Sequence, residues 1–197
     1  MIENVCVFAA SSDAAVAAFG DAAERLGQLL AEAGMTLVYG AGKVGLMGSV
    51  AASVHRHGGR VVGVIPEKLD VDALTYRACD ELIVTGTMSE RKAIMTARAD
   101  GFVVLPGGFG TLEELFEVLV GKQLGYHGKP IIFLNTGGAF DGLMAYFAEM
   151  ISVELVRADQ CDLFSVASTP EGALEALRTH QPTPITGKWT APVPLNP

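Results

Sequence analysis

Short apolar runs recur along this chain, and the segments between them repeat apolar residues every three or four positions. The first run, Val5 to Ala9, has no polar residue between its ends, which is typical of a strand covered on both faces. Similar runs predict strands at 36–39, 61–65, 81–84, 101–105, 130–134 and 164–167. The stretch 67–78 between two of them is polar and irregular, and we expect it to form a mobile rim.

The segments between the runs have helical periodicity. In the first of them, Phe19 and Leu26 share one face, Ser12 or Asp13 suits the N-cap, and Gly34 suits the position after the C-cap. The same reasoning predicts helices after Gly45, at 88–99, after Thr111, at 140–151 and from Pro170 to Thr179. Alternating strands and helices predict an α/β fold, a doubly wound (Rossmann-like), mostly parallel sheet with helices on both faces.

Composition is consistent with one globular domain at residues 1–181, followed by a proline-rich tail at 182–197 that we expect to pack on the surface or on a partner. The formal net charge is −8, and the longest basic run is the pair Arg91 and Lys92, so nucleic acid and anionic membranes are poor partners. The N-terminus lacks a basic leader and no apolar run reaches 18 residues, which predicts a cytoplasmic protein.

Three cysteines, Cys6, Cys79 and Cys161, are far apart and predict neither a disulfide framework nor a zinc site. No metal is expected, because His55 and His57 would point to roughly opposite sides of a helix. No cofactor is expected either. Pyridoxal phosphate would need a Schiff-base lysine, and none of the six lysines is in a context that singles it out.

The central feature of the sequence is the glycine turn at 105–114. A buried strand precedes it and an apolar helix follows it, so backbone N–H groups and the positive end of a helix dipole face the turn. Such a turn at the carboxyl end of a strand predicts a phosphate site. A simpler interpretation is that Thr111 and Glu114 form a capping box, in which Thr111 is the N-cap and Glu114 is the N3 residue.

A second glycine turn, 40–48, contains G-x-G-x-x-G between a predicted strand and a predicted helix. It differs from a dinucleotide fingerprint, because it follows the second strand and no strand-ending acid lies about 20 residues on. It is either a tight turn into a packed helix, an NAD site, or the second backbone wall of one nucleotide pocket. We favour the last interpretation. The turn after the first strand, with Ser11 and Ser12, reaches the same edge of the sheet.

The motifs P-G-G-x-G-T-x-x-E at 106–114 and M-x-x-R-K at 88–92, together with the turn at 38–48, resemble the LONELY GUY family of cytokinin riboside 5′-monophosphate phosphoribohydrolases. Members have often been labelled "lysine decarboxylase". The resemblance covers about residues 5–178. It implies a homodimer that hydrolyses the N-glycosidic bond of an adenine-type nucleoside 5′-monophosphate, releasing the base and ribose 5-phosphate.

The resemblance also implies residue roles. Arg91 and Glu114 match the catalytic pair. Lys92 and the segment 108–114 match the family's nucleotide-binding positions. Together with the three turns at the sheet edge, this gives as expected substrate-binding residues Ser11, Ser12, Gly42, Met88, Lys92, Pro106, Gly107, Gly108, Gly110 and Thr111. The chain departs from the family pattern at three places, since many members carry Glu at the position of Ala73, Thr at that of Val120, and Cys-Gly at that of Ala9 and Ala10. These departures affect the preference for base and ribose and leave the chemistry intact.

Chemistry supports the same roles. Glycoside cleavage passes through an oxocarbenium-like state that a carboxylate such as Glu114 stabilises, and Arg91 offers a planar cation for phosphate or ribose oxygens. The main alternative is a carrier that holds a nucleotide or phosphorylated cofactor without turning it over; related Rossmann-like carriers of molybdenum cofactor look similar in outline. An NAD-dependent oxidoreductase would rest on the second glycine turn alone.

Overall fold

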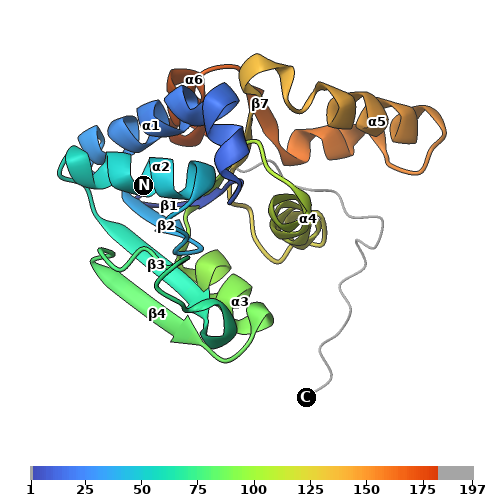
Figure 1. Cartoon of the computed structure of the whole chain (residues 1–197). Coiled ribbons are helices and arrows are strands. Elements are labelled where there is room, and N and C mark those ends of the chain that lie inside the picture. Colours follow the sequence, from blue (N-terminus) through green and yellow to red (C-terminus); the bar gives the residue numbers. More distant parts are fainter. Residues whose placement is uncertain (1, 182–197) are drawn as a thin grey trace.

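A computed structural model describes residues 2–181, so the predicted tail at 182–197 lies outside the described residues. The described part of the chain alternates strands and helices, as the apolar pattern predicts (Figure 1). The strands are β1 (Asn4–Phe8), β2 (Thr36–Tyr39), β3 (Val61–Pro66), β4 (Glu81–Thr85), β5 (Gly101–Val104), β6 (Ile131–Leu134) and β7 (Ser165–Ala167). The α-helices are α1 (Val16–Glu32), α2 (Gly45–Arg56), α3 (Met88–Arg98), α4 (Phe109–Gln123), α5 (Asp141–Ser152) and α6 (Pro170–Thr179).

All seven strands form one parallel sheet in the order β4-β3-β2-β1-β5-β6-β7. The chain therefore builds outward from β1 in one direction, returns to β5 on the other side of β1, and continues in the opposite direction. This reversal places the topological switch point between the carboxyl ends of β1 and β5, where ligands bind in open α/β sheets. The predicted fold class is confirmed.

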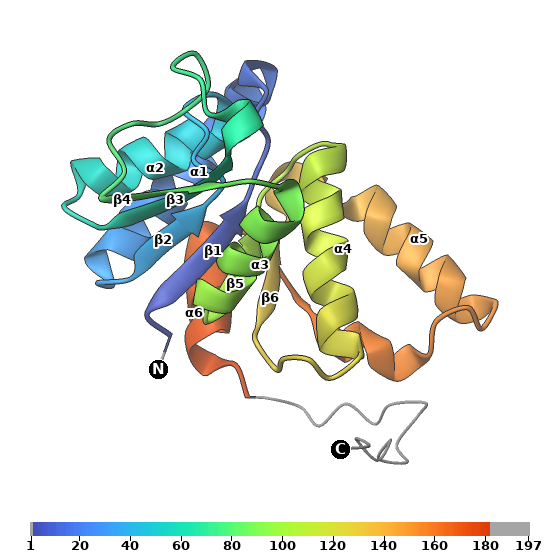
Figure 2. The ribbon, with the colours of Figure 1, turned by 90° about the horizontal axis from the view of Figure 1, so that it is seen from below.

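Each face of the sheet has its own apolar core because alternate residues of a strand point to opposite faces. Val5 and Val7 pack with α1, α2 and α6, whereas Cys6 and Phe8 pack with α3, α4 and α5. Figure 1 shows α1, α2 and α6 together on one side of the sheet, and Figure 2 shows α3 and α4 covering the other side, with α5 outside α4. Among the described residues, no helix is long and apolar enough to cross a membrane.

The helix caps predicted from the sequence can be compared with the structure. α1 ends as predicted, with Gly34 at φ +68° and two Schellman-type bonds, from Gly34 N to Ala31 O and from Met35 N to Leu30 O. Pro170 begins α6 as predicted, behind the N-cap Thr169. The predicted side-chain cap of α1 is wrong. Ser12 makes no capping bond, and the Asp13 carboxylate instead accepts a bond from Gly45 N at 2.8 Å, in the next turn of the fold.

Candidate active site

Three turns meet at the switch point and enclose a cavity of about 570 Å³. The backbone of Ala10 joins them, because its N–H donates to Pro106 O at 3.1 Å and its carbonyl accepts from Met47 N at 3.2 Å. The second glycine turn is therefore one wall of the same cavity, as we favoured from the sequence. Nine of the predicted site residues line it: Ser11, Ser12, Gly42, Met88, Arg91, Gly108, Gly110, Thr111 and Glu114.

The first turn of α4 forms the wall opposite the second glycine turn. The helix begins at Phe109 with Gly108 as N-cap, and no side chain caps it. The predicted capping box of Thr111 and Glu114 is therefore wrong, since Thr111 is already the third residue of the helix. The N–H groups of this turn have no intrahelical partner and lie beside the cavity, which is the arrangement that binds anions.

Gly107 and Thr111 pack against each other beneath this turn. A Cβ at Gly107 would lie 2.1 Å from Thr111 Oγ1, far inside contact distance. Thr111 is buried, so the missing side chain at residue 107 is what lets the helix start so close to the strand. Gly107 and Pro106 themselves line a neighbouring cavity, toward Phe140, rather than the main one. Their contribution to the main cavity is therefore indirect, through the position of the first turn of α4.

Arg91 is buried beneath the cavity with its guanidinium in a fixed position. Its Nε donates to the carbonyl of Val64 in β3 at 3.1 Å, and its Nη1 lies 3.1 Å from Met88 Sδ and 3.4 Å from Glu114 Oε1. Arg98 lies about two turns further along the same helix, but it is exposed and pairs with Glu81 on the edge strand β4. Only Arg91 is placed to act in the cavity.

The start of α3 positions Arg91. Thr87 Oγ1 accepts from Glu90 N at 3.1 Å, and the Glu90 carboxylate accepts from Thr87 N at 3.1 Å, which completes a capping box. Arg91 is the next residue of the helix, so the cap fixes its place relative to β3. We did not single out this box from the sequence, although Thr87-x-x-Glu90 matches its pattern.

Glu114 faces Arg91 from α4, and only 12% of its side chain is exposed. Burial raises the pKa of Glu114 to about 7; the charge of Arg91 opposes this shift, and Glu113 adds to it. A carboxyl group that titrates near neutral pH can accept and return a proton at the working pH of an enzyme. Glu114 is therefore a buried acid–base group, and Arg91 is a fixed cation beside it.

Lys92 does not line the cavity, although the resemblance implies that it binds nucleotide. Its ammonium instead pairs with Glu113 and Glu117 of α4, of which only Glu113 lines the cavity. The hydrogen bond to Glu113 raises the pKa of Lys92, and burial lowers it less. In this structure Lys92 joins α3 to α4.

The rim of the cavity is the segment 67–78, irregular as predicted apart from a short 3₁₀ turn, Glu67–Leu69. It is tied to the second glycine turn by backbone bonds from Lys43 N to Leu74 O and from Tyr76 N to Ala41 O, each 2.8 Å long. Leu69 and Leu74 line the cavity from this rim, and Ile65, Met88 and Phe109 extend the apolar surface. Ala73 lies on the same rim and is exposed.

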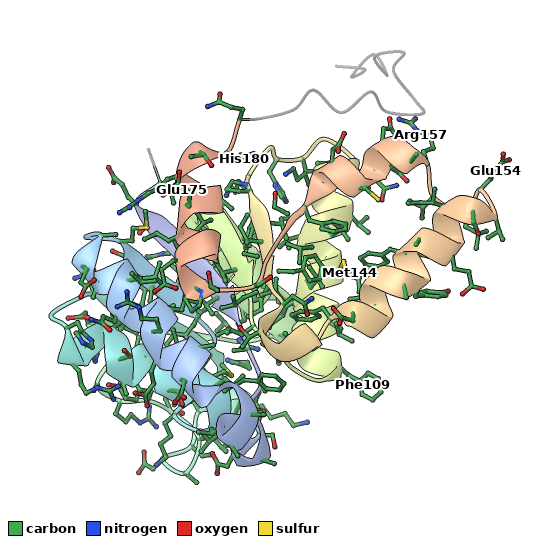
Figure 3. The ribbon with its side chains drawn as sticks, turned by 90° about the horizontal axis from the view of Figure 1, so that it is seen from above. Phe109, Met144, Glu154, Arg157, Glu175 and His180 are labelled. Carbon is green, nitrogen blue, oxygen red and sulfur yellow. The ribbon has the colours of Figure 1, made fainter. Side chains whose placement is uncertain are left out.

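Phe109 is the most exposed large apolar residue near the cavity, at 93% of its surface. Figure 3 shows its ring pointing away from the ribbon at the start of α4. Val120, a second site of departure from the family pattern, is also exposed on α4. The third, Ala9 and Ala10, lines the cavity floor.

Neither a metal cluster nor a paired histidine site occurs in the described part of the chain. His55 bonds Tyr76 and Asp80, whereas His57 Nδ1 contacts the carbonyl of Ser53 in its own helix. The two histidines therefore serve separate local contacts.

Comparisons with known proteins identify the family of this chain. The profile of a protein family described as "Possible lysine decarboxylase" matches residues 47–177. The cytokinin riboside 5′-monophosphate phosphoribohydrolase LOG of Oryza sativa subsp. japonica is 39% identical over 91% of this chain and 74% of its own. The enzyme of that name LOG5 of Arabidopsis thaliana is 38% identical over 91% of this chain and 79% of its own.

Solved structures share the fold. The molybdenum cofactor carrier protein from Chlamydomonas reinhardtii aligns with a TM-score of 0.70 at 24% identity, over 90% of this chain and 97% of that protein. The molybdenum cofactor binding protein from Rippkaea orientalis aligns with a TM-score of 0.69 at 24% identity, over 90% and 96%. These likenesses show the fold, whereas the sequence relatives show the family. The chain belongs to the family of cytokinin riboside 5′-monophosphate phosphoribohydrolases.

Proposed function

We propose that this protein hydrolyses the N-glycosidic bond of an adenine-type nucleoside 5′-monophosphate, releasing the free base and ribose 5-phosphate. The observation that carries this proposal is the buried pair of Arg91 and Glu114, which lies beside an uncapped helix start in one cavity. A carrier needs the anion site alone and has no use for a carboxyl group that titrates near pH 7. The relatives described above are named for this reaction.

The 5′-phosphate is placed at the start of α4. Its oxygens accept hydrogen bonds from the free N–H groups around Gly108 and Gly110, and the helix dipole adds a favourable field. The turn lacks side chains that would keep the phosphate away from the backbone. This placement leaves the ribose between the helix start and the Arg91–Glu114 pair.

Glu114 and Arg91 then act on the reacting carbon. As the bond from C1′ to the base nitrogen breaks, its electron pair stays on the base, which takes a proton from solvent. The Glu114 carboxylate stabilises the oxocarbenium-like sugar and accepts a proton from the water whose oxygen bonds C1′. Arg91 holds the carboxylate in place and keeps part of its population ionised at neutral pH.

The base lies against the apolar side of the cavity. Ile65, Leu69, Leu74 and Met88 provide a surface that suits a purine ring and also an alkyl substituent on its exocyclic nitrogen. The proposed substrates are therefore AMP and its prenylated analogues. Leu69 and Leu74 are partly exposed on the rim, so the outer end of this surface is open enough to admit an added apolar group.

The test incubates the purified protein with AMP, isopentenyladenosine monophosphate and the matching nucleosides, and measures free base and ribose 5-phosphate. We expect release from the monophosphates and far slower release from adenosine. Tight binding of AMP without release of adenine would favour a carrier. Equal rates for adenosine and AMP would mean that the phosphate does not bind at the start of α4 as proposed.

We also propose that the protein is a homodimer joined through α4. Phe116, Val120 and Leu124 follow one another at helical spacing and are all exposed, and Phe109 and Tyr126 extend the apolar surface at both ends. Contiguous apolar surface of this kind marks protein interfaces. Because Phe109 also lines the cavity, the partner would lie beside the substrate.

Sedimentation at micromolar concentration tests this assembly. Leu124→Glu should convert the dimer to monomer, whereas Leu155→Glu, at a still more exposed apolar position after α5, should leave the mass unchanged. A fully active parent monomer would refute the proposal.

A further inference from the structure

A second cavity, of about 350 Å³, lies at the amino-terminal edge of the sheet, away from the Arg91–Glu114 pair. It is enclosed by the end of α4, the start of β6 and β7, and the end of α6. Figure 3 shows His180 at the end of α6, next to the loop that follows α4, where its Nε2 lies 3.0 Å from Gly128 O. Most of the wall is polar: Lys122, Asp162, Ser165, Thr179, His180 and Gln181.

Lys122 is the unusual member of this wall. It is only 3% exposed, yet no hydrogen bond or ion pair joins its ammonium to any residue that the structure describes. Asp162 lies on the same wall and makes no ion pair with it. Burial lowers the pKa of Lys122, and no acidic group counteracts that shift. Among the described residues, the polar side-chain atoms that are fully enclosed without a partner belong to Tyr39 and Thr136, so the buried part of Lys122 is its alkyl chain and its ammonium opens on the cavity.

The end of α4 supplies only part of what this charge needs. Lys122 is in the last turn of the helix, where the dipole favours a cation. A dipole does not replace an acceptor for the three N–H groups of an ammonium. None of the described residues supplies that acceptor, and the cavity in front of Lys122, of about 350 Å³, has the size of a small-molecule site.

We propose that this cavity binds a small oxyanion of the phosphate or carboxylate type, with Lys122 as its charged ligand. Ser165 and Gln181 border the space with groups that can donate hydrogen bonds to its oxygens, whereas the Thr179 hydroxyl already donates to the carbonyl of Glu175 at 2.8 Å. Asp162 limits the negative charge that the site tolerates and can accept a bond from a hydroxyl of the ligand. The site is separate from the proposed nucleotide cavity, because Lys122 follows Glu114 by eight residues, about 12 Å along α4.

Chemical labelling of the whole chain tests the site without interference from the nucleotide cavity. A lysine with a lowered pKa reacts readily with dinitrofluorobenzene near neutral pH, and mass spectrometry reports each lysine separately. We expect phosphate to slow labelling of Lys122 severalfold and to leave the exposed Lys68 unchanged. Acetate in a parallel arm shows whether a carboxylate is sufficient, and chloride controls for ionic strength. Labelling of Lys122 that neither phosphate nor acetate slows would overturn the proposal.

Lys122→Met supplies the second readout, since methionine keeps the length of the side chain and removes the charge. In buffer without phosphate this variant should melt close to the temperature of the parent, because methionine keeps the buried alkyl packing and the charge it removes makes no ion pair with the described residues. Phosphate should raise the melting temperature of this variant less than that of the parent, because only the site at the start of α4 remains. A variant that melts several degrees lower and keeps the full rise would show that Lys122 is structural, and the proposal would fail.

Discussion

Arg91 occupies the space that any side chain at residue 40 would need. A Cβ at Gly40 would lie 1.7 Å from Arg91 Nη2 and 2.8 Å from its Cζ. On the other side, the same guanidinium bonds the Val64 carbonyl and faces Glu114. Gly40 is not among the residues with positive φ, so its role is to leave room rather than to adopt a special backbone conformation.

Gly40→Ala should therefore displace Arg91 and abolish most of the activity. We expect adenine release to fall at least about 100-fold, close to the effect of Arg91→Met, and unfolding free energy to fall by about 1–3 kcal/mol through overpacking. Gly121→Ala is the control, because a Cβ there meets only His127 at an ordinary 3.5 Å. Normal kcat in Gly40→Ala would mean that the position of Arg91 does not matter for the reaction.

Glu114→Gln separates charge and proton transfer from shape. Glutamine preserves the volume but cannot take a proton from water, so kcat should fall by about 10²–10⁴ while AMP still binds. In the parent protein, kcat should rise with pH through about 7 as Glu114 ionises. The variant should lack that inflection. A parent rate that instead falls as pH rises through 7 would assign Glu114 the role of a proton donor.

The raised pKa of Glu114 also predicts how stability varies with pH. The folded state binds this proton up to about pH 7, whereas an unfolded glutamate releases it near 4.5, so the folded protein loses stability as pH rises between these values. The shift corresponds to roughly 3 kcal/mol at most. The melting temperature of Glu114→Gln relative to the parent should thus rise as pH increases from 4.5 to 7, with the difference at pH 4.5 as the reference.

The sequence predicts the strands and the meeting of the three turns because both depend on strong local patterns. Apolar runs identify the sheet, and parallel strands bring their carboxyl ends to one edge. The start of α4 was mispredicted because Thr111-x-x-Glu114 satisfies a capping pattern that the fold does not use. Gly107 lets the helix begin a turn earlier, and that depends on packing between Gly107 and Thr111 rather than on a local signal.

Side chains that depend on partners far along the chain were the hardest to place. Helical periodicity places Arg91 and Arg98 on the same face of α3. They differ in their partners, because Arg98 pairs with Glu81 on the edge strand β4, whereas Arg91 faces Glu114. Lys122 has no motif at all. Its burial depends on the short 3₁₀ segment Ala158–Leu163, which is far along the chain and packs against α4.

Lys92 offers a test of what the family motif means in this chain. Its ammonium is engaged by Glu113 and Glu117, outside the cavity, so Lys92→Met should lower the melting temperature modestly and change KM for AMP by less than about 5-fold. Lys92→Arg should restore the melting temperature. A KM that rises about 100-fold with stability unchanged would show that Lys92 turns to the nucleotide when substrate binds.

A matched pair of glycines tests whether the phosphate approaches the backbone of α4. Gly110 and Gly142 are each the second residue of a helix, and a Cβ at either would meet nothing within 4 Å. Alanine at either position should therefore raise unfolding free energy by a similar amount, about 0.4–1 kcal/mol, by restricting the unfolded chain. Only Gly110 lines the cavity.

If a phosphate lies on this turn, Gly110→Ala places a methyl group where its oxygens bind. A hydrogen bond to a charged group contributes about 1.5–3 kcal/mol, so KM for AMP should rise by roughly 10- to 100-fold in this variant and stay unchanged in Gly142→Ala. Inhibition by inorganic phosphate should weaken in parallel, because it uses the same amides. If both variants keep the KM of the parent, the substrate phosphate binds elsewhere, and the uncapped start of α4 is not its site.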